Sequence, residues 1–170
     1  MLTRDLLADV YGRVSEEVHG VLDGATPKLL GHRPDPSSNT VAWLVWHLTR
    51  VQDDHVAEVA GTEQRWTVGN WAERFGLPFA TDATGYGQSP DEVAAVEVDA
   101  DLLQSYFDEV HAATLAYLER LEDDDLDRVV DESWDPPVTL GVRLVSVASD
   151  DLQHVGQAAY VRGLAERAGL

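Results

Sequence analysis

The chain has 170 residues, 44% of them hydrophobic, which is enough for one domain with its own apolar core. It carries 31 acidic residues against 12 basic ones, a formal net charge of −19, so a nucleic-acid backbone or an anionic membrane is a poor partner. Cysteine is absent, which excludes disulfides, thiolate metal ligands and a cysteine nucleophile, so any metal must have nitrogen and oxygen ligands. No signal peptide or transmembrane run is visible, and we expect a cytoplasmic protein with a single domain over residues 1–170.

Two segments in the first third of the chain have the apolar spacing of amphipathic helices. The first helix is predicted over residues 2–22, and the second over residues 40–60, where it stops before Gly61, a residue typical of helix C-termini. The segment between them, "GATPKLLGHRPDPSSN", contains three prolines and two glycines and is predicted to be a loop. Its last three residues suit the capping of the second helix: Ser37, Ser38 and Asn39.

A long aromatic segment, residues 62–98, follows the second helix. The stretches "GLPF" and "TGYGQSP" interrupt it, so it is not one continuous helix. An insertion of this length and aromatic content indicates a folded lid rather than a disordered linker. Within it, "SPDE" at residues 89–92 is a helix-start pattern, with Ser89 as the cap, proline in the first helical position and a glutamate three residues on.

The last two predicted helices cover residues 100–121, with Asp99 as the cap, and residues 140–168. Residues 122–139 between them are predicted to be a loop. Four long amphipathic helices without a convincing strand pattern predict an all-α protein. The expected fold is a four-helix bundle with a long aromatic-rich insertion between its second and third helices.

Three residues on two of these helices are candidates for a metal site. Asp150 and His154 are four residues apart, so they lie on one partly apolar face of the fourth helix. His47 lies on the second helix, and bundles build metal sites from side chains on facing helices. Two histidines and one carboxylate form a facial triad with open positions, which suits zinc, nickel or iron. The alternatives are a structural or surface pair for Asp150 and His154, and a core histidine beside two tryptophans for His47.

The stretches "NTVAWLVWHLTRVQ" and "DDLQHVGQAAYVRG" resemble the corresponding parts of the DinB-like superfamily of four-helix metal proteins. This family includes thiol-dependent S-transferases such as the mycothiol- and bacillithiol-linked enzymes. The resemblance covers essentially the whole chain and implies the same bundle fold. It also implies a divalent metal, an external low-molecular-weight thiol and, because bundles of this family often pair their helices, a possible homodimer.

The family usually holds its metal with one histidine on the second helix and an H-x-x-x-H pair on the fourth. Carried over by position, the resemblance assigns the metal to His47 and His154, and the first histidine of the pair falls on Asp150. An aspartate can ligate the same ions but lowers the net charge of the site. Either the metal preference has therefore shifted or metal binding has been lost.

Together with the resemblance, these features predict a divalent-metal-dependent protein of the DinB family, a thiol-dependent (mycothiol-type) S-transferase or isomerase that acts on a small electrophile. The alternative is a non-catalytic bundle that binds a metal or a small apolar or anionic ligand. Five further residues are expected to bind substrate or to support the ligands: Arg50, Asp54, Asp151, Gln157 and Arg162. The expected partner is a small-molecule substrate, with no nucleic acid and no membrane.

Overall fold

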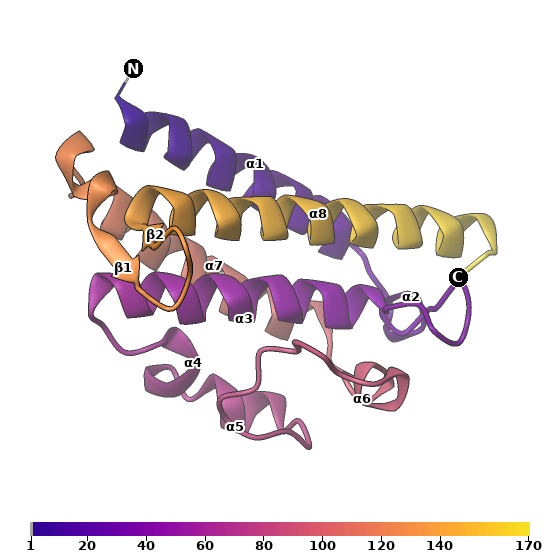
Figure 1. The fold of residues 1–170 in the computed structure, drawn as a ribbon. Coiled ribbons are helices and arrows are strands. Elements are labelled where there is room, and N and C mark those ends of the chain that lie inside the picture. The colour runs from indigo at the N-terminus through magenta and orange to yellow at the C-terminus, as the bar shows by residue number, and fades with distance from the viewer. Residues whose placement is uncertain (1) are drawn as a thin grey trace.

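Four long helices form a bundle in the computed structural model, which describes residues 2–170 (Figure 1). They are α1 (Thr3–Leu22), α3 (Val41–Ala60), α7 (Ala100–Leu118) and α8 (Leu140–Arg167). Helices α7 and α8 each contact both α1 and α3, so α1 lies diagonally opposite α3 in the bundle. The predicted all-α four-helix bundle is confirmed, although α7 ends at Leu118 rather than at residue 121.

Side-chain caps begin three of these helices. The Thr40 hydroxyl accepts a hydrogen bond from the amide of Trp43 at the start of α3, while Asp99 caps α7 as predicted and Thr139 caps α8. The expectation that Ser37, Ser38 or Asn39 caps α3 was wrong, because the helix starts one residue after Thr40. Gly61 ends α3 in the left-handed conformation, at φ 67°.

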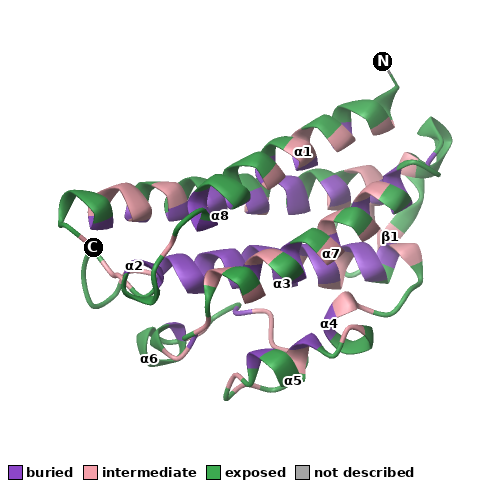
Figure 2. Ribbon diagram, turned by 180° about the vertical axis from the view of Figure 1, so that it is seen from behind, coloured by how far each residue is buried: buried purple, intermediate pink, exposed green. Residues whose placement is uncertain are grey.

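Helix α3 is the most deeply buried element of the bundle, as the purple ribbon of Figure 2 shows. It packs between α7 and α8 on one side, and the segment between residues 62 and 98 covers its remaining side. This double cover explains why polar residues such as Thr49, Gln52 and Asp53 are buried on a helix whose sequence looks amphipathic. The apolar core has two clusters, one that includes the first half of α3 and one that includes Val56 and Val59 near its end.

The insertion is a folded layer with three short helices, α4 (Arg65–Val68), α5 (Trp71–Phe75) and α6 (Pro90–Ala94). Trp66, Trp71 and Phe75 are buried, and their ring centroids lie 5.1, 5.5 and 5.7 Å from that of Tyr106 on α7. The predicted helix start at Ser89 is confirmed, because Ser89 and Glu92 form a reciprocal capping box. The expectation of a folded insertion is therefore confirmed.

Two segments predicted as plain loops contain short elements. Helix α2 (Pro27–Leu30) lies between α1 and α3, and a 3₁₀ helix, η1 (Asp123–Asp127), follows α7. Strands β1 (Val129–Asp131) and β2 (Val138–Thr139) form an antiparallel hairpin in which Val129 pairs with Thr139. These elements are too short to show a periodic pattern, and the hairpin matters because it lies beside the start of α8 (Figure 1).

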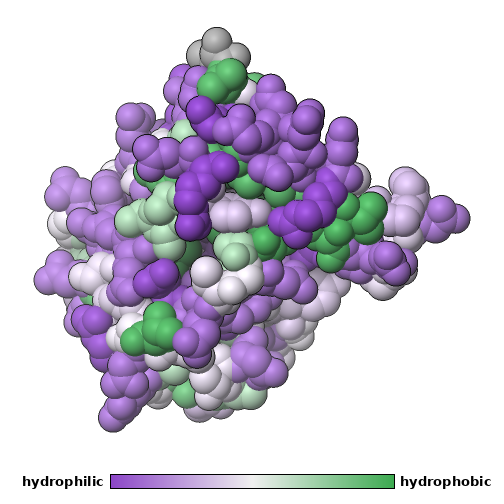
Figure 3. Space-filling model, turned by 90° about the vertical axis from the view of Figure 1, so that its left-hand side faces the viewer, coloured by the Kyte–Doolittle hydropathy of each residue, from purple (hydrophilic) through white to green (hydrophobic). Residues whose placement is uncertain are grey.

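The surface at the hairpin end of the bundle is mainly hydrophilic, with a few separate apolar patches (Figure 3). This agrees with the large acidic excess of the sequence. Among residues 2–170, no helix has both the length and the apolar character that crossing a bilayer requires.

Candidate metal centre

His47, Asp150 and His154 come together where α3 and α8 pack against each other. Each offers one ligand atom, and these three atoms all lie within 4.8 Å of one another. The Nε2 atom of His154 is 3.5 Å from Oδ1 of Asp150, and the two imidazole centroids are 4.8 Å apart. The fold thus assembles the three residues that the sequence singled out as metal ligands.

The insertion sets the orientation of the His47 ring. Nδ1 of His47 lies 2.5 Å from the carbonyl oxygen of Thr84, and a carbonyl only accepts hydrogen bonds, so Nδ1 carries the proton. Nε2 is then left with a free lone pair, as metal ligation requires. The ring also stacks on Trp43 at 4.5 Å. Burial lowers the pKa of His47, which favours the neutral form that can bind a metal.

A glutamine and an aspartate hold the ring of His154. Nδ1 lies 2.9 Å from Oε1 of Gln157, one turn further along α8, so this pair orients the imidazole. Nε2 faces Asp150, and the hydrogen bond with that carboxylate raises the pKa of His154. The raised pKa favours the protonated form of His154, which pairs with Asp150, and a bound cation would take the place of that proton.

Asp150 is the ligand whose surroundings most clearly require a positive charge. Burial alone would raise its pKa, but the hydrogen bond and charge of His154, together with His47 and His55, outweigh burial and lower it. Its Oδ2 atom is buried and has no hydrogen-bond partner among the residues that the structure describes. One carboxylate with an unpaired oxygen and two imidazoles together form a set of ligand atoms that fits a divalent ion such as zinc, nickel or iron.

Two neighbouring carboxylates, Asp54 and Asp151, have different surroundings. Asp54 is partly exposed, and its Oδ1 accepts a hydrogen bond from Gln64 at 2.6 Å. Asp151 is fully buried, and neither of its carboxylate oxygens has a partner within residues 2–170. Burial and the charge of Asp150 raise the pKa of Asp151 well above its ordinary value, which favours its neutral form.

The two predicted arginines make bonds within the fold. Arg50 is fully buried, and its guanidinium donates to the carbonyl oxygen of Ala83 and to Gln64, and lies 3.7 Å from Asp53. Arg162 binds the carbonyl groups that end α1, those of Gly20, Val21 and Asp23. Arg50 therefore has partners inside the fold, and Arg162 binds carbonyl groups that the end of a helix leaves without partners.

A cavity of about 1050 Å³ opens beside the triad, with His47 and Asp150 in its wall. Four valines supply its apolar lining: Val51, Val142, Val145 and Val147. Tyr86 of the insertion and Trp134 of the hairpin also line it, with 93% and 66% of their surfaces exposed. The three candidate metal ligands therefore lie next to a space large enough for a small organic molecule.

Several residues of this site were not predicted from the sequence. His55 lines the same cavity, and Thr84, Tyr86 and Trp134, which also line it, lie in irregular segments. The one available signal was the presence of aromatic residues in loops rich in glycine and proline, "TGYGQSP" and "ESWDPP".

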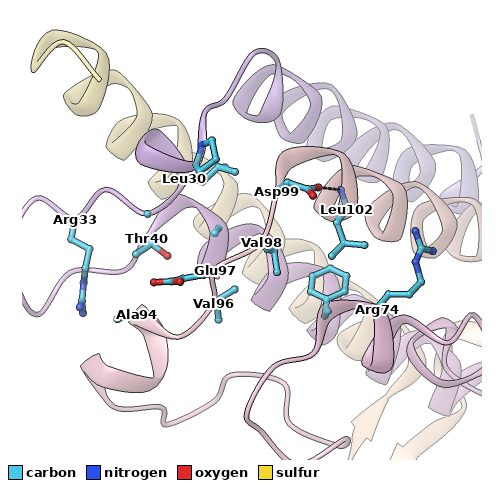
Figure 4. A pocket seen from close by; sticks show the side chains of 14 residues that line it. Leu30, Arg33, Thr40, Arg74, Ala94, Val96, Glu97, Val98, Asp99 and Leu102 are labelled. Atoms are coloured by element: carbon cyan, nitrogen blue, oxygen red, sulfur yellow. Dashed lines mark hydrogen bonds between the residues drawn. The ribbon is translucent and has the colours of Figure 1, made fainter.

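A second cavity, of about 720 Å³, lies at the other end of α3 (Figure 4). Its lining comes from α2, the start of α3 and the chain that links α6 to α7, and Asp99 in its wall is already bonded to the amide of Leu102. Among residues 2–170, its lining includes none of the residues predicted for the site. The cavity beside the triad is therefore the better candidate for chemistry.

The chain is similar to known proteins over nearly its whole length. A structure described as "Crystal structure of the conserved protein of locus from Enterococcus faecalis" superimposes with a TM-score of 0.89 at 32% sequence identity, covering 95% of this chain and 96% of that one. No curated protein matches the chain. The model of the DinB superfamily matches residues 11–158. The chain belongs to the DinB superfamily.

Proposed function

We propose that the protein is a divalent-metal-dependent enzyme that transfers a small external thiol of the mycothiol type to an electrophile, or isomerises such an adduct. The observation that carries the proposal is the triad of His47, Asp150 and His154 beside a large cavity that has His47 and Asp150 in its wall, with one oxygen of Asp150 that has no hydrogen-bond partner within residues 2–170. Membership of the DinB superfamily supports the same reaction class.

The donor set suits zinc, nickel or iron, because two imidazoles and one carboxylate leave coordination positions open. When bound, such an ion lowers the pKa of a thiol or a water molecule and so supplies a nucleophile at neutral pH. The chain has no cysteine, so the thiol must come from outside.

The protein's own residues orient the ligands and shape the space for the substrate. Thr84 fixes the tautomer of His47, and Gln157 orients His154. The valines of the cavity offer an apolar surface that excludes water from part of a bound electrophile. We therefore place a small-molecule substrate in this cavity.

A second candidate function is a non-catalytic bundle that binds a metal or a small ligand. The observation that favours it is the direct pairing of Asp150 with His154, at 3.5 Å. A protonated His154 can satisfy one oxygen of Asp150 without any metal. The H-x-x-x-H pair that is usual in the family could not form such an ion pair.

Metal content and turnover separate these functions. Purified wild type is expected to hold about one equivalent of metal by elemental analysis, and His47→Ala and His154→Ala are expected to lose it. His19→Ala is the matched control, because His19 is an exposed histidine paired with Asp108 on another face. Unchanged metal content in the two site variants would refute the metal assignment.

The activity assay uses mycothiol, a panel of electrophiles and protein loaded with nickel, zinc, manganese or iron. Turnover that depends on the metal and disappears in His154→Ala supports the transferase. Stoichiometric metal without turnover for any combination favours the binding protein.

A further inference from the structure

We infer that the cavity beside the triad selects a small organic cation with an apolar body over an anion of the same shape. The inference rests on the proposed function, because it names the substrate class of that same site. It depends on three features of the cavity: the charges in its wall, the partners of the nearest arginine, and two exposed aromatic rings.

Among the described residues that line the cavity, the carboxylates are the only charged groups of fixed sign. Asp54 and Asp150 line it, and within residues 2–170 no lysine or arginine is among the lining residues. His55 also lines it, but its Nδ1 lies 2.7 Å from the guanidinium of Arg143, which can only donate, so this nitrogen accepts and the ring is neutral. The local potential of the metal-free cavity therefore opposes an anion.

Arg143, the cation that lies behind His55, is already neutralised. Its guanidinium lies 3.1 Å from Asp131 and 3.4 Å from Glu58, and its side chain is only 14% exposed. An incoming carboxylate or phosphate would have to displace these partners before it could use this charge. Arg143 is therefore not free to bind an anionic ligand at this wall of the cavity.

Asp54 retains an oxygen that can face a ligand. Gln64 occupies Oδ1, whereas Oδ2 is 4.0 Å from the neutral His55 ring, and the side chain is 38% exposed. This oxygen can accept a charge-assisted hydrogen bond from an ammonium group.

Tyr86 and Trp134 complete the recognition of a cation. They come from opposite sides of the site, the insertion and the β1–β2 hairpin, and both line the cavity with most of their surface open. Large aromatic side chains left open to water are unusual on a mainly hydrophilic surface and are suited to stack on a ligand. Aromatic faces attract organic cations, and the valine wall accommodates an apolar body.

The test uses three probes with similar skeletons and different charge: 2-phenylethylammonium, 2-phenylethanol and phenylacetate. Each is titrated into EDTA-treated wild-type protein, with backbone amide shifts followed by NMR up to about 10 mM, a range that covers weak binding. The cation is expected to bind about tenfold or more tightly than phenylacetate, with the alcohol between them. The shifts are expected to map to Val142, Val145 and the hairpin.

Variants separate local recognition from the general attraction of a protein with net charge −19. Asp54→Asn keeps an acceptor for Gln64 and should weaken binding of the cation by about three- to tenfold. Trp134→Leu should weaken this binding by about two- to fivefold. Glu17→Gln is the charge-matched control, since Glu17 is exposed on α1 away from the cavity, and should change affinity by less than about twofold.

Three results would overturn the inference: no detectable binding of the cation, equal affinity for the three probes, or equal losses in Asp54→Asn and Glu17→Gln. Because all binding is measured without metal or thiol, cation selectivity can hold while turnover fails, which would reject the proposed function alone. Turnover with anionic electrophiles and no cation selectivity would reject the inference alone.

Discussion

Gly85 lies directly against His47: a Cβ atom built on this glycine would be 2.7 Å from Nδ1 of the histidine. The same atom would be 3.1 Å from the rings of Trp43 and Trp46. Gly85 also has a φ of +99°, a conformation that side chains rarely adopt. The glycine thus allows the preceding residue, Thr84, to bring its carbonyl group to His47.

Gly85→Ala is expected to destabilise the protein by about 2 to 4 kcal/mol, from backbone strain and overpacking together. It should also weaken metal binding by about ten- to a hundredfold, because the hydrogen bond that orients His47 is displaced. Urea unfolding and a competitive metal-chelator titration measure the two effects.

Gly87→Ala is the control for strain alone. Gly87 has a positive φ of +72°, and a Cβ built on it meets no heavy atom within 4 Å. This variant should lose about 1 to 2 kcal/mol of stability and keep its metal affinity. Equal loss of metal affinity in both variants would show that the contact with His47 is not what orients the ligand.

The bundle and the triad could be predicted from the sequence because both depend on helical periodicity. The spacing of four between Asp150 and His154 places them on one face whatever the rest of the chain does. His47 required one more step, the packing of its helix against the fourth, which the bundle architecture and the family resemblance supplied. The three candidate ligands could thus be predicted because they lie on regular helices.

The rest of the site lies in irregular segments, for which no such rule exists. Thr84 reaches His47 only through the path of a segment that Arg50 and Asp53 hold against α3. Trp134 reaches the cavity because β1 and β2 pair, and these strands have only three and two residues. Such contacts depend on tertiary packing that overrides local pattern.

Asp53 is predicted to be the main anchor of the insertion. It accepts hydrogen bonds of 2.8 Å from the amides of Arg65 and Trp66 and from the Tyr106 hydroxyl, and it pairs with the buried Arg50. Asp53→Ala leaves the buried guanidinium of Arg50 without its carboxylate, so urea unfolding should show a loss of about 3 to 5 kcal/mol.

The adjacent Asp54→Ala is the control for Asp53→Ala. It removes a partly exposed carboxylate with one side-chain donor and should cost less than about 1.5 kcal/mol. If the two variants lost the same free energy, the insertion would not depend on the buried pair. Limited proteolysis should cut residues 62–98 faster in Asp53→Ala than in Asp54→Ala.

The pair of Asp150 and His154 predicts a pH-dependent stability in metal-free protein. The pKa of His154 is raised by its hydrogen bond with Asp150, so its contribution is full below the unfolded value of about 6.5 and is lost as pH rises through the folded value. The pKa of Asp150 is lowered, so its contribution is lost as pH falls through that lowered value. The advantage of wild type over Asp150→Asn should therefore be larger at about pH 5.5 than at about pH 8.5.

Urea unfolding in EDTA at these two pH values measures the effect, and an NMR titration of His154 measures its cause. In Asp150→Asn the pKa of His154 should fall, because burial then acts without the opposing carboxylate. Asp108→Asn, which breaks the more exposed pair with His19, is the control and should show a smaller pH dependence. A pH-independent difference for Asp150→Asn would contradict the pairing.

Asp151, the next residue along α8, predicts a second pH dependence with a different cause. It is fully buried without a hydrogen-bond partner in the part of the chain that the structure describes, and burial raises its pKa well above that of the unfolded chain. Above the unfolded pKa of about 4, folding therefore takes up a proton, and wild type loses stability as pH rises toward the folded pKa. Asp151→Asn has no such proton to bind, so its unfolding free energy relative to wild type should increase from about pH 4.5 to about pH 7.5 in EDTA-treated protein. A relative stability that falls or stays constant over this range would mean that Asp151 is ionised in the folded protein and has a cationic partner.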